Sequence, residues 1–374
     1  EPWRGRSHRI WLDRWTWRDN GAAFTGPALG IRRFPVSIGQ GVYLPQLDGQ
    51  GRKMSKSQGN VISPHDVMKQ YGADILRLWV ASSNISDDIR ISTDSLARIS
   101  ESYRKIRNTF KYLIGNLHGF DPAKEKLEEE KMLEVDRWAL SKLERLKEEV
   151  TQGYESYQFH RVYHAVYNFC VTEMSSFYLD VLKDRLYTDS RSSLSGRSSR
   201  CALYEILTDL ARMLAPVLSF TSEEVWGHLG FSESIFLGSW PKFLPHRRDA
   251  QVEERWERFL VFRDEVLKAL EISREKKEIG NSLEAEVELS VSKKEEAVFL
   301  KSFNEDLPGL FLVSHVSIAH DPVADPETPR VIVRRARGQK CERCWNWRET
   351  VGKEKRHPTL CHRCVEVLKG DFES

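Results

Sequence analysis

Two lysines lie three residues apart in a short stretch that could bind phosphate groups. Lys53 and Lys56 are interleaved with the hydroxyl side chains of Ser55 and Ser57, and glycines flank the stretch. Glycine permits the backbone angles that a mobile loop needs, so this loop can close over a polyanion. Lysine suits that task because it carries a compact charge on a flexible stem, and such charges stabilise a departing pyrophosphate. The alternative is an ordinary solvated basic turn.

Four cysteines near the end of the sequence have the spacing of metal ligands. Two C-x2-C pairs, sixteen residues apart, comprise Cys341, Cys344, Cys361 and Cys364. Four thiolates in a tetrahedron form a closed structural zinc site, because no ligand position is left for water. Disulfide pairing is the alternative, which the reducing compartment indicated by the cysteine usage disfavours. His357 and His362 could also bind a metal, but a complete set of four thiolates makes them unnecessary.

The segment around these cysteines is basic and contains two tryptophans. From Val331 onward the sequence has eleven lysine and arginine residues against six aspartate and glutamate residues. Basic side chains can hold the phosphates of RNA, and exposed indoles can stack on unpaired bases. Trp345 and Trp347 either stack in this way or cover the metal core. The candidates for contact with an RNA backbone are Arg334, Arg335, Arg337, Lys340 and Arg343.

The chain of 374 residues is long enough for two or three domains with their own cores. Charged residues make up 30% of the sequence but the net charge is only +2, so local patches must meet any nucleic-acid partner. No apolar run is long enough to cross a membrane, and residues 1–6 lack the apolar core of a secretory signal. Six cysteines in a chain of this length fit a reducing compartment, which predicts a cytoplasmic protein.

Helical periodicity dominates the middle of the sequence and predicts an antiparallel bundle from about residue 94 to 230. The clearest three-and-four spacings of apolar residues lie in residues 134–150, 157–182 and 203–213. In the first of these segments the charged residues are expected on a solvent-exposed face: Lys142, Glu144, Arg145, Lys147, Glu148 and Glu149. The charges of Lys183, Asp184 and Arg185 are also expected to be solvated rather than to contact phosphates.

After the bundle the periodicity changes. A charged helix is expected at residues 252–277, followed by strands at residues 285–291, 310–319 and 330–335. The polar stretches at residues 188–199 and 241–249 are expected to be loops or linkers. These elements predict a small α/β subdomain that leads directly into the cysteine cluster.

Residues 1–45 have little periodicity. Their tryptophans alternate with arginines at Trp3, Trp11, Trp15 and Trp17. Such interleaving could stack on single-stranded bases, but a weakly folded segment is the expected alternative. Residues 42–47 are predicted to form one strand that leads into the lysine loop.

Several motifs, in this order, resemble one family. The string KMSKS at residues 53–57 resembles the nucleotide-binding signature of class I aminoacyl-tRNA synthetases. Further similar stretches are YGADILRLW at 71–79, SSFYLD at 175–180, KDRLY at 183–187, AP at 215–216 and FTSEEVW at 220–226. Together with the four cysteines they resemble the C-terminal part of bacterial-type isoleucyl-tRNA synthetases, from residue 47 to the end. The signature alone would fit the valine, leucine, methionine or cysteine enzymes equally well.

The resemblance implies a mainly α fold built on an anticodon-binding helical bundle of the class I synthetase type. The implied segments are a divergent region at 1–46, a remnant of the Rossmann-like catalytic domain with the KMSKS loop at 47–93, the bundle at 94–245, a helix with a small α/β subdomain at 250–335, and a four-cysteine zinc module at 336–374.

The resemblance also implies an isoleucine–tRNA ligase, which joins isoleucine to tRNA-Ile through an aminoacyl-adenylate with ATP and magnesium. Lys53 and Lys56 would be catalytic, with Lys56 on the ATP phosphates beside Ser55 and Ser57. The bundle would dock the anticodon stem, the zinc module would hold the anticodon end, and the protein would be a monomer without membrane contact.

Nothing in the sequence matches the family's other nucleotide signature, of the His-Ile-Gly-His type, and His8 stands alone. The isoleucine pocket and the editing domain of the family are absent as well. A C-terminal fragment with little ligase activity of its own is therefore expected, because adenylate formation needs groups on both sides of ATP. The competing hypothesis is an inactive zinc-containing RNA-binding module in which the lysine loop is vestigial.

Overall fold

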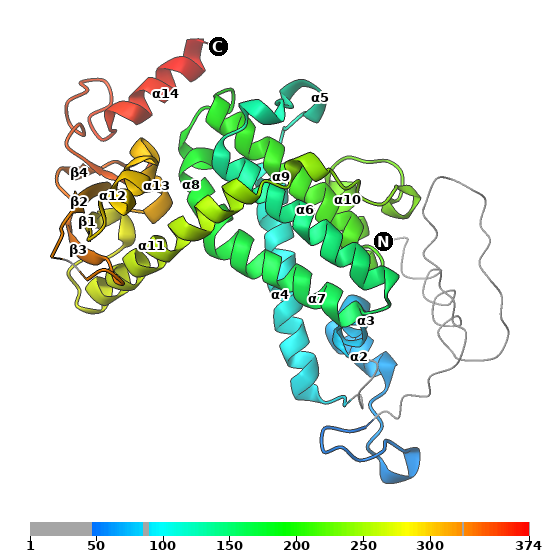
Figure 1. Cartoon of the computed structure of the whole chain (residues 1–374). Helices are drawn as coiled ribbons and strands as arrows, with labels where there is room; N and C mark the ends of the chain where they lie inside the picture. The colour runs from blue at the N-terminus through cyan, green and yellow to red at the C-terminus, as the bar shows by residue number, and fades with distance from the viewer. Residues whose placement is uncertain (1–46, 85–89, 324, 374) are drawn as a thin grey trace.

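The computed structural model describes residues 47–84, 90–323 and 325–373, which form a long helical body with a small sheet at one end (Figure 1). The predictions for the tryptophans of residues 1–45 and for a strand at 42–47 lie outside these residues, except at Leu47. Leu47 forms isolated β-bridges with Lys53 and Arg90. Among the described residues, no helix is long and apolar enough to cross a membrane.

The lysine loop leads into two short helices, α2 (Pro64–Tyr71) and α3 (Ala73–Ser82). Pro64 opens α2 because the first helical position does not need its amide hydrogen. Gly72 joins the helices at φ 93°, a conformation that residues with a side chain rarely adopt. Within α3, Asp74 accepts hydrogen bonds from the backbone nitrogen and the hydroxyl of Thr221, both at 2.7 Å. Asp74 thereby caps the start of α10 (Ser219–His228), which has no side-chain cap at its own N-cap position.

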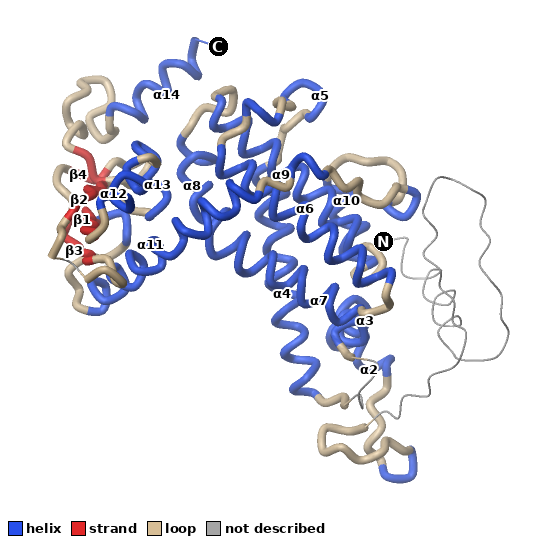
Figure 2. The backbone as a smooth tube through the Cα atoms, viewed as in Figure 1, coloured by secondary structure: helices blue, strands red, loops and turns tan. Residues whose placement is uncertain are grey.

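The predicted bundle is confirmed. Its main helices are α4 (Thr93–Asn116), α6 (Glu134–Glu155), α7 (Phe159–Asn168), α8 (Leu179–Thr188), α9 (Leu194–Leu214) and α10. Apolar faces with three-and-four spacing bury large side chains such as Trp138, Phe110, Phe177 and Tyr178 at its centre. The helices pack side by side in the middle of the molecule (Figure 2).

The helical pattern of residues 157–182 corresponds to one uninterrupted run. Helices α7 and α8 are joined by the ten-residue π-helical segment η3 (Phe169–Tyr178). The wider π-helical winding changes which backbone carbonyls are bonded within the helix. The carbonyl of Ser176 accepts a hydrogen bond at 3.2 Å from Arg263 of α11 (Ala250–Glu275). This helical segment therefore contacts α11, which follows the bundle in the chain.

The predicted exposed face of α6 is wrong for three of its charged residues. Lys142, Glu144 and Lys147 are buried. Lys147 lies 2.5 Å from Glu144 and 3.0 Å from Asp209 of α9, and Lys142 pairs with two glutamates of α11. The sequence pattern misleads here because α6 is covered on more than one side, so its charges find partners on neighbouring helices instead of water.

Helix α11 (Ala250–Glu275) leads from the bundle to a three-stranded sheet, drawn in red in Figure 2. Strand β1 (Ala285–Val291) lies in the middle, parallel to β2 (His315–His320) and antiparallel to β3 (Arg330–Arg335). The strand predicted at 310–319 is partly wrong, because α13 (Leu307–Phe311) occupies its beginning. The predicted loop at 188–199 is also too long, since Ser193 caps α9 by accepting from the amide of Gly196, and α9 begins at Leu194.

Shorter elements complete the described part of the chain. They are η1 (Lys56–Gln58), α5 (Pro122–Glu125), η2 (Glu129–Lys131), η4 (Ile235–Leu237), η5 (Pro245–Arg247), η6 (Ser282–Glu284), α12 (Lys294–Lys301), η7 (Asn304–Asp306), β4 (Gln339–Lys340), β5 (Trp347–Arg348) and α14 (His362–Glu373). One apolar cluster extends from the bundle into the sheet, whereas the cysteine module has a small core of its own.

Candidate metal centre and lysine loop

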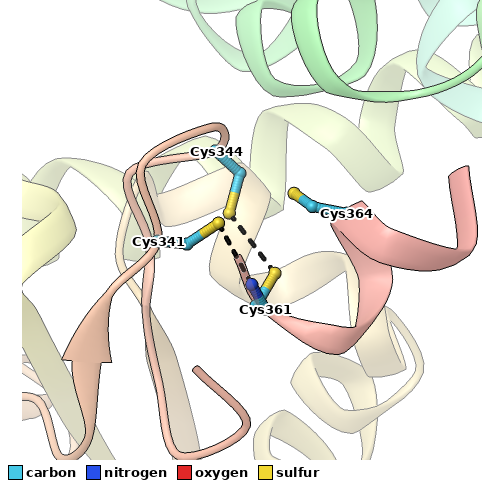
Figure 3. Close-up of side chains that lie close together, drawn as sticks. All are labelled: Cys341, Cys344, Cys361 and Cys364. Atoms are coloured by element: carbon cyan, nitrogen blue, oxygen red, sulfur yellow. Dashed lines mark hydrogen bonds between the residues drawn. The ribbon is translucent and has the colours of Figure 1, made fainter. Parts of the chain in front are cut away.

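The four cysteines predicted as metal ligands converge on one point (Figure 3). Cys341 and Cys344 come from the turn that links β4 to β5, and Cys361 and Cys364 come from the start of α14. All four are buried, and their sulfur atoms lie within 4.8 Å of one another. The sulfurs of Cys344 and Cys361 are 3.7 Å apart. Zinc–sulfur bonds of about 2.3 Å place tetrahedral sulfurs about 3.8 Å apart, so the donor set fits a zinc ion.

The closely spaced thiols of this cluster shift one another's pKa values. Hydrogen bonds from Cys344 and Cys364 lower the pKa of Cys361, and the shared protons raise the pKa of Cys364. The backbone nitrogen of Cys361 donates a hydrogen bond at 3.3 Å to the sulfur of Cys341. Four thiolates at this distance repel one another unless a cation neutralises them.

The two histidines that could have replaced a cysteine take no part in this cluster. His357 and His362 are exposed, and Nδ1 of His362 lies 3.4 Å from a carboxylate oxygen of Glu354. In the described part of the chain, the four cysteines are the group of side chains that could hold a metal ion. The rest of the module's core is small, with Val351 and Leu360 packed against the cysteines.

The module is attached to the C-terminal end of α8 by two arginines next to the ligands. Arg363 donates to both carboxylate oxygens of Asp184 at 2.7 Å, and to the hydroxyl of Thr188 at 2.5 Å. Arg343 donates to the backbone carbonyl of Thr188. Arg343 was predicted to contact RNA, and the structure instead places it against the bundle. Cationic donors are favourable there because the last carbonyls of a helix lack partners within it.

The expectation that Asp184 and Arg185 are solvated is therefore wrong. Arg185 points into the bundle and forms an ion pair at 2.6 Å with Asp136, which is fully buried. Asp184, the preceding residue of α8, accepts two hydrogen bonds from Arg363. Lys183 keeps an exposed local pair with Asp180 at 2.6 Å, as expected for a solvated residue.

The two tryptophans of the module have different environments. Trp345 is 58% exposed and adopts φ 63°, with the ammonium of Lys340 5.4 Å from its ring. Trp347 is half-buried beneath the guanidinium of Arg335, 4.9 Å from its ring centre. Of the remaining RNA candidates, Arg337 is exposed, and Arg334 forms an ion pair with Glu288 at 2.9 Å. The exposed indole is thus Trp345, next to a lysine.

The lysine loop lies at the opposite end of the molecule from α14, in blue before α2 in Figure 1. Lys53 is exposed, and Lys56 opens the single helical turn η1. The hydroxyls of Ser55 and Ser57 are 3.2 Å apart, while the half-buried Met54 packs against the main apolar cluster. The two predicted hydroxyls therefore lie side by side, and Lys53 is exposed in the same loop.

Two further loop residues were not singled out from the sequence. Asp48 and Asn60 lie on either side of KMSKS, and the amide nitrogen of Asn60 donates to the Asp48 carboxylate at 3.0 Å. Donors on the backbone and side chain of Arg52, together with Asn60, lower the pKa of Asp48 well below its ordinary value. The Asp48-Gly49 pair, typical of a turn, is the signal in the sequence that could have indicated the first of them.

Comparison with known proteins matches three families to successive segments of the chain, which contain the lysine loop, the bundle and the four cysteines in that order. The family described as "tRNA synthetases class I (I, L, M and V)" matches residues 43–92, which contain the lysine loop. "Anticodon-binding domain of tRNA ligase" matches residues 136–289, from α6 to β1. "Zinc finger found in FPG and IleRS" matches residues 338–367, which contain all four cysteines.

Curated relatives match most of the chain. It is 51% identical over 330 residues to the isoleucine–tRNA ligase of Syntrophotalea carbinolica. It is 46% identical over 337 residues to that of Caldanaerobacter subterraneus and 45% identical over 331 residues to that of Geobacter sulfurreducens. Each match covers 86% of this chain, and the chain spans 36% of the length of each relative.

Proposed function

The chain belongs to the isoleucine–tRNA ligase family and corresponds to its C-terminal region, and from this we propose that it binds tRNA-Ile as part of an ATP-dependent ligase. The bundle docks the anticodon stem, and the zinc module holds the anticodon end. The observation that best supports this proposal is the attachment of the zinc module to α8, because Arg343 and Arg363 hold it against the domain that matches an anticodon-binding family.

In this proposal zinc holds the module together, and the exposed residues of the module contact RNA. Cys341, Cys344, Cys361 and Cys364 would hold one zinc ion, which neutralises the four thiolates and has no open position for catalysis. The small core of the module cannot hold the turn and α14 together without that ion. Arg337, Lys340 and Trp345 are the exposed residues proposed to contact RNA, the cations at phosphates and the indole at an unpaired base.

The lysine loop contacts ATP in this proposal. Lys53 and Lys56 place cations at the phosphates, and the hydroxyls of Ser55 and Ser57 donate further hydrogen bonds as negative charge develops on the leaving pyrophosphate. Magnesium accompanies ATP as its counter-ion. Support comes from the exposure of Lys53 and from the shared turn of the two serines.

Ligase activity is proposed only for a protein of the relatives' full length, because this chain spans 36% of that length. Isoleucine is proposed as the amino-acid substrate because the relatives are isoleucine–tRNA ligases. A cytoplasmic location is proposed because the cysteines are free thiols, and a monomeric state because the sequence resembles this family. The second candidate function is an RNA-binding module in which the lysine loop has no nucleotide role. The exposed basic residues and the indole of the zinc module favour it independently of the loop.

Binding measurements separate the two candidates. The chain should bind tRNA-Ile more tightly than a tRNA with a different anticodon, and equal affinity for the two would contradict recognition of the anticodon end. Substitution Lys56→Ala should weaken binding of magnesium ATP while the tRNA-Ile affinity stays unchanged. If Lys56→Ala alters neither the affinity for magnesium ATP nor the affinity for tRNA-Ile, the loop has no nucleotide role. The RNA-binding module is then the better description.

A further inference from the structure

A carboxylate and an amide on either side of KMSKS bind each other directly. Asp48 and Asn60 are twelve residues apart, and Nδ2 of Asn60 lies 3.0 Å from Oδ2 of Asp48. This contact brings the start of the lysine loop next to its end. The residues between them therefore form a closed loop rather than an open excursion of the chain.

Asp48 organises the first half of this loop. Its Oδ1 accepts hydrogen bonds from the backbone nitrogens of Gln50 at 3.0 Å and Arg52 at 2.9 Å. Its Oδ2 accepts from Nε of Arg52 at 2.9 Å, in addition to Asn60. The residue is only 7% exposed, and four donors occupy the carboxylate. Asp48 is thus saturated by the loop itself and has no capacity left for a magnesium ion.

Asn60 organises the second half. Its Oδ1 accepts a hydrogen bond from the backbone nitrogen of Ser55 at 2.9 Å, in the middle of the signature. Its Nδ2 also donates to the backbone carbonyl of Lys53 at 3.3 Å. Asn60 consequently fixes the backbone of two signature residues and leaves the Lys53 side chain exposed.

We infer that Asp48 and Asn60 are positioning residues, which hold the KMSKS backbone in the conformation that presents its lysines and hydroxyls to a triphosphate. The inference rests on the proposed ATP contact of this loop. The two residues act through the loop and do not touch ATP. A loop ordered before binding loses less conformational entropy when it closes on the phosphates, so the contact between Asp48 and Asn60 contributes to ATP affinity.

Three variants of the full chain test this contact. Asp48→Asn places two amides against each other, and Asn60→Asp places two carboxylates against each other. The double variant restores an amide–carboxylate pair with the donor on the other residue. Gln58→Ala, an exposed substitution in the same loop, is the matched control.

Amide hydrogen exchange of residues 49–60 reports loop order without ATP. Exchange should be faster in each single variant than in wild type, slower again in the double variant, and unchanged in Gln58→Ala. Affinity for magnesium ATP should follow the same order, with a loss of about tenfold in each single variant. Affinity for tRNA-Ile should not change, which a general folding defect would not allow.

The outcomes distinguish this inference from the proposed function. If the single variants exchange like wild type, or the double variant is no better than either single one, Asp48 and Asn60 do not order the loop and the inference is wrong. If the wild-type chain shows no affinity for magnesium ATP while exchange follows the predicted order, the nucleotide role of the loop fails, and the positioning role fails with it.

Discussion

Arg363 donates two parallel hydrogen bonds at 2.7 Å to the carboxylate of Asp184, across 179 positions of sequence. Arg363 lies between two of the cysteines, and Asp184 lies on α8 of the bundle. A guanidinium matches a carboxylate in this two-point geometry, which fixes orientation as well as distance. The position of the zinc module on the bundle therefore depends on a side chain that the cysteines themselves hold in place.

Removing this contact should loosen the module, which Arg343 also attaches, without unfolding the bundle. In Arg363→Ala we expect the free energy of unfolding to fall by only about 1 kcal/mol, because the guanidinium is partly exposed. We also expect faster amide exchange in α14. Zinc content should stay the same. The matched control is Arg104→Ala, which removes an exposed pair with Glu101 elsewhere on the bundle. Unchanged exchange in α14 would show that Arg363 does not hold the module.

The buried pair of Lys147 with Glu144 and Asp209 should be costly to break from one side. Lys147→Met removes the cation that lies nearest to two buried carboxylates, so the free energy of unfolding should fall by about 3 kcal/mol. Urea unfolding measures this value. Lys183→Met, at an exposed pair on α8, is the control and should change stability by less than about 1 kcal/mol. Equal effects of the two substitutions would contradict the burial of Lys147.

The turn before the cysteines should depend on Gly338. This residue has φ 90°, and a Cβ atom there would overlap the carbonyl of Arg348 and lie 2.6 Å from the amide nitrogen of Glu349. Gly338→Ala should therefore separate β4 from β5 and weaken zinc retention during titration with a chelator. Gly352→Ala is the control, because Gly352 has φ 89° but no neighbour near its added methyl group. Equal zinc retention in the two variants would contradict the role of this close approach.

The loop contact between Asp48 and Asn60 should be insensitive to pH near neutrality. The pKa of Asp48 is lowered in the fold, so its stabilising contribution is present above the unfolded-state pKa of about 3.9 and is lost as the pH falls through the lower, folded value. The NMR signals of the Asn60 side-chain amide should stay constant between about pH 5 and pH 8. A transition within that range would show that Asp48 lacks these donors.

The sequence predicted the parts of the fold that depend on local spacing. The four cysteines, the bundle and the strands beginning at Ala285 and Arg330 follow from motifs or periodicity within short segments. The partners of Lys147 and Arg363 could not be predicted, because they lie 62 and 179 residues away in Asp209 and Asp184. The pattern within one amphipathic helix predicts that its charged residues are solvent-exposed, because it does not show whether a second helix covers them.

The same reason explains what was missed at the candidate sites. Arg343 has the residue type of an RNA contact, and only the position of α8 shows that it bonds to Thr188. Asp48 and Asn60 are ordinary turn residues by type, and their role appears when the loop brings them to 3.0 Å. Residue type and spacing identified the four cysteines that converge on one point, whereas the residues that position this cluster depend on tertiary contacts.

We propose that the zinc module and the bundle form one surface for tRNA-Ile. The most direct test is the dissociation constant for tRNA-Ile of the zinc-loaded chain, compared with the chain after chelation and after zinc is restored. We expect chelation to weaken binding by about tenfold or more, which is at least about 1.4 kcal/mol, and added zinc to reverse the loss. Equal affinity with and without zinc would contradict the proposal.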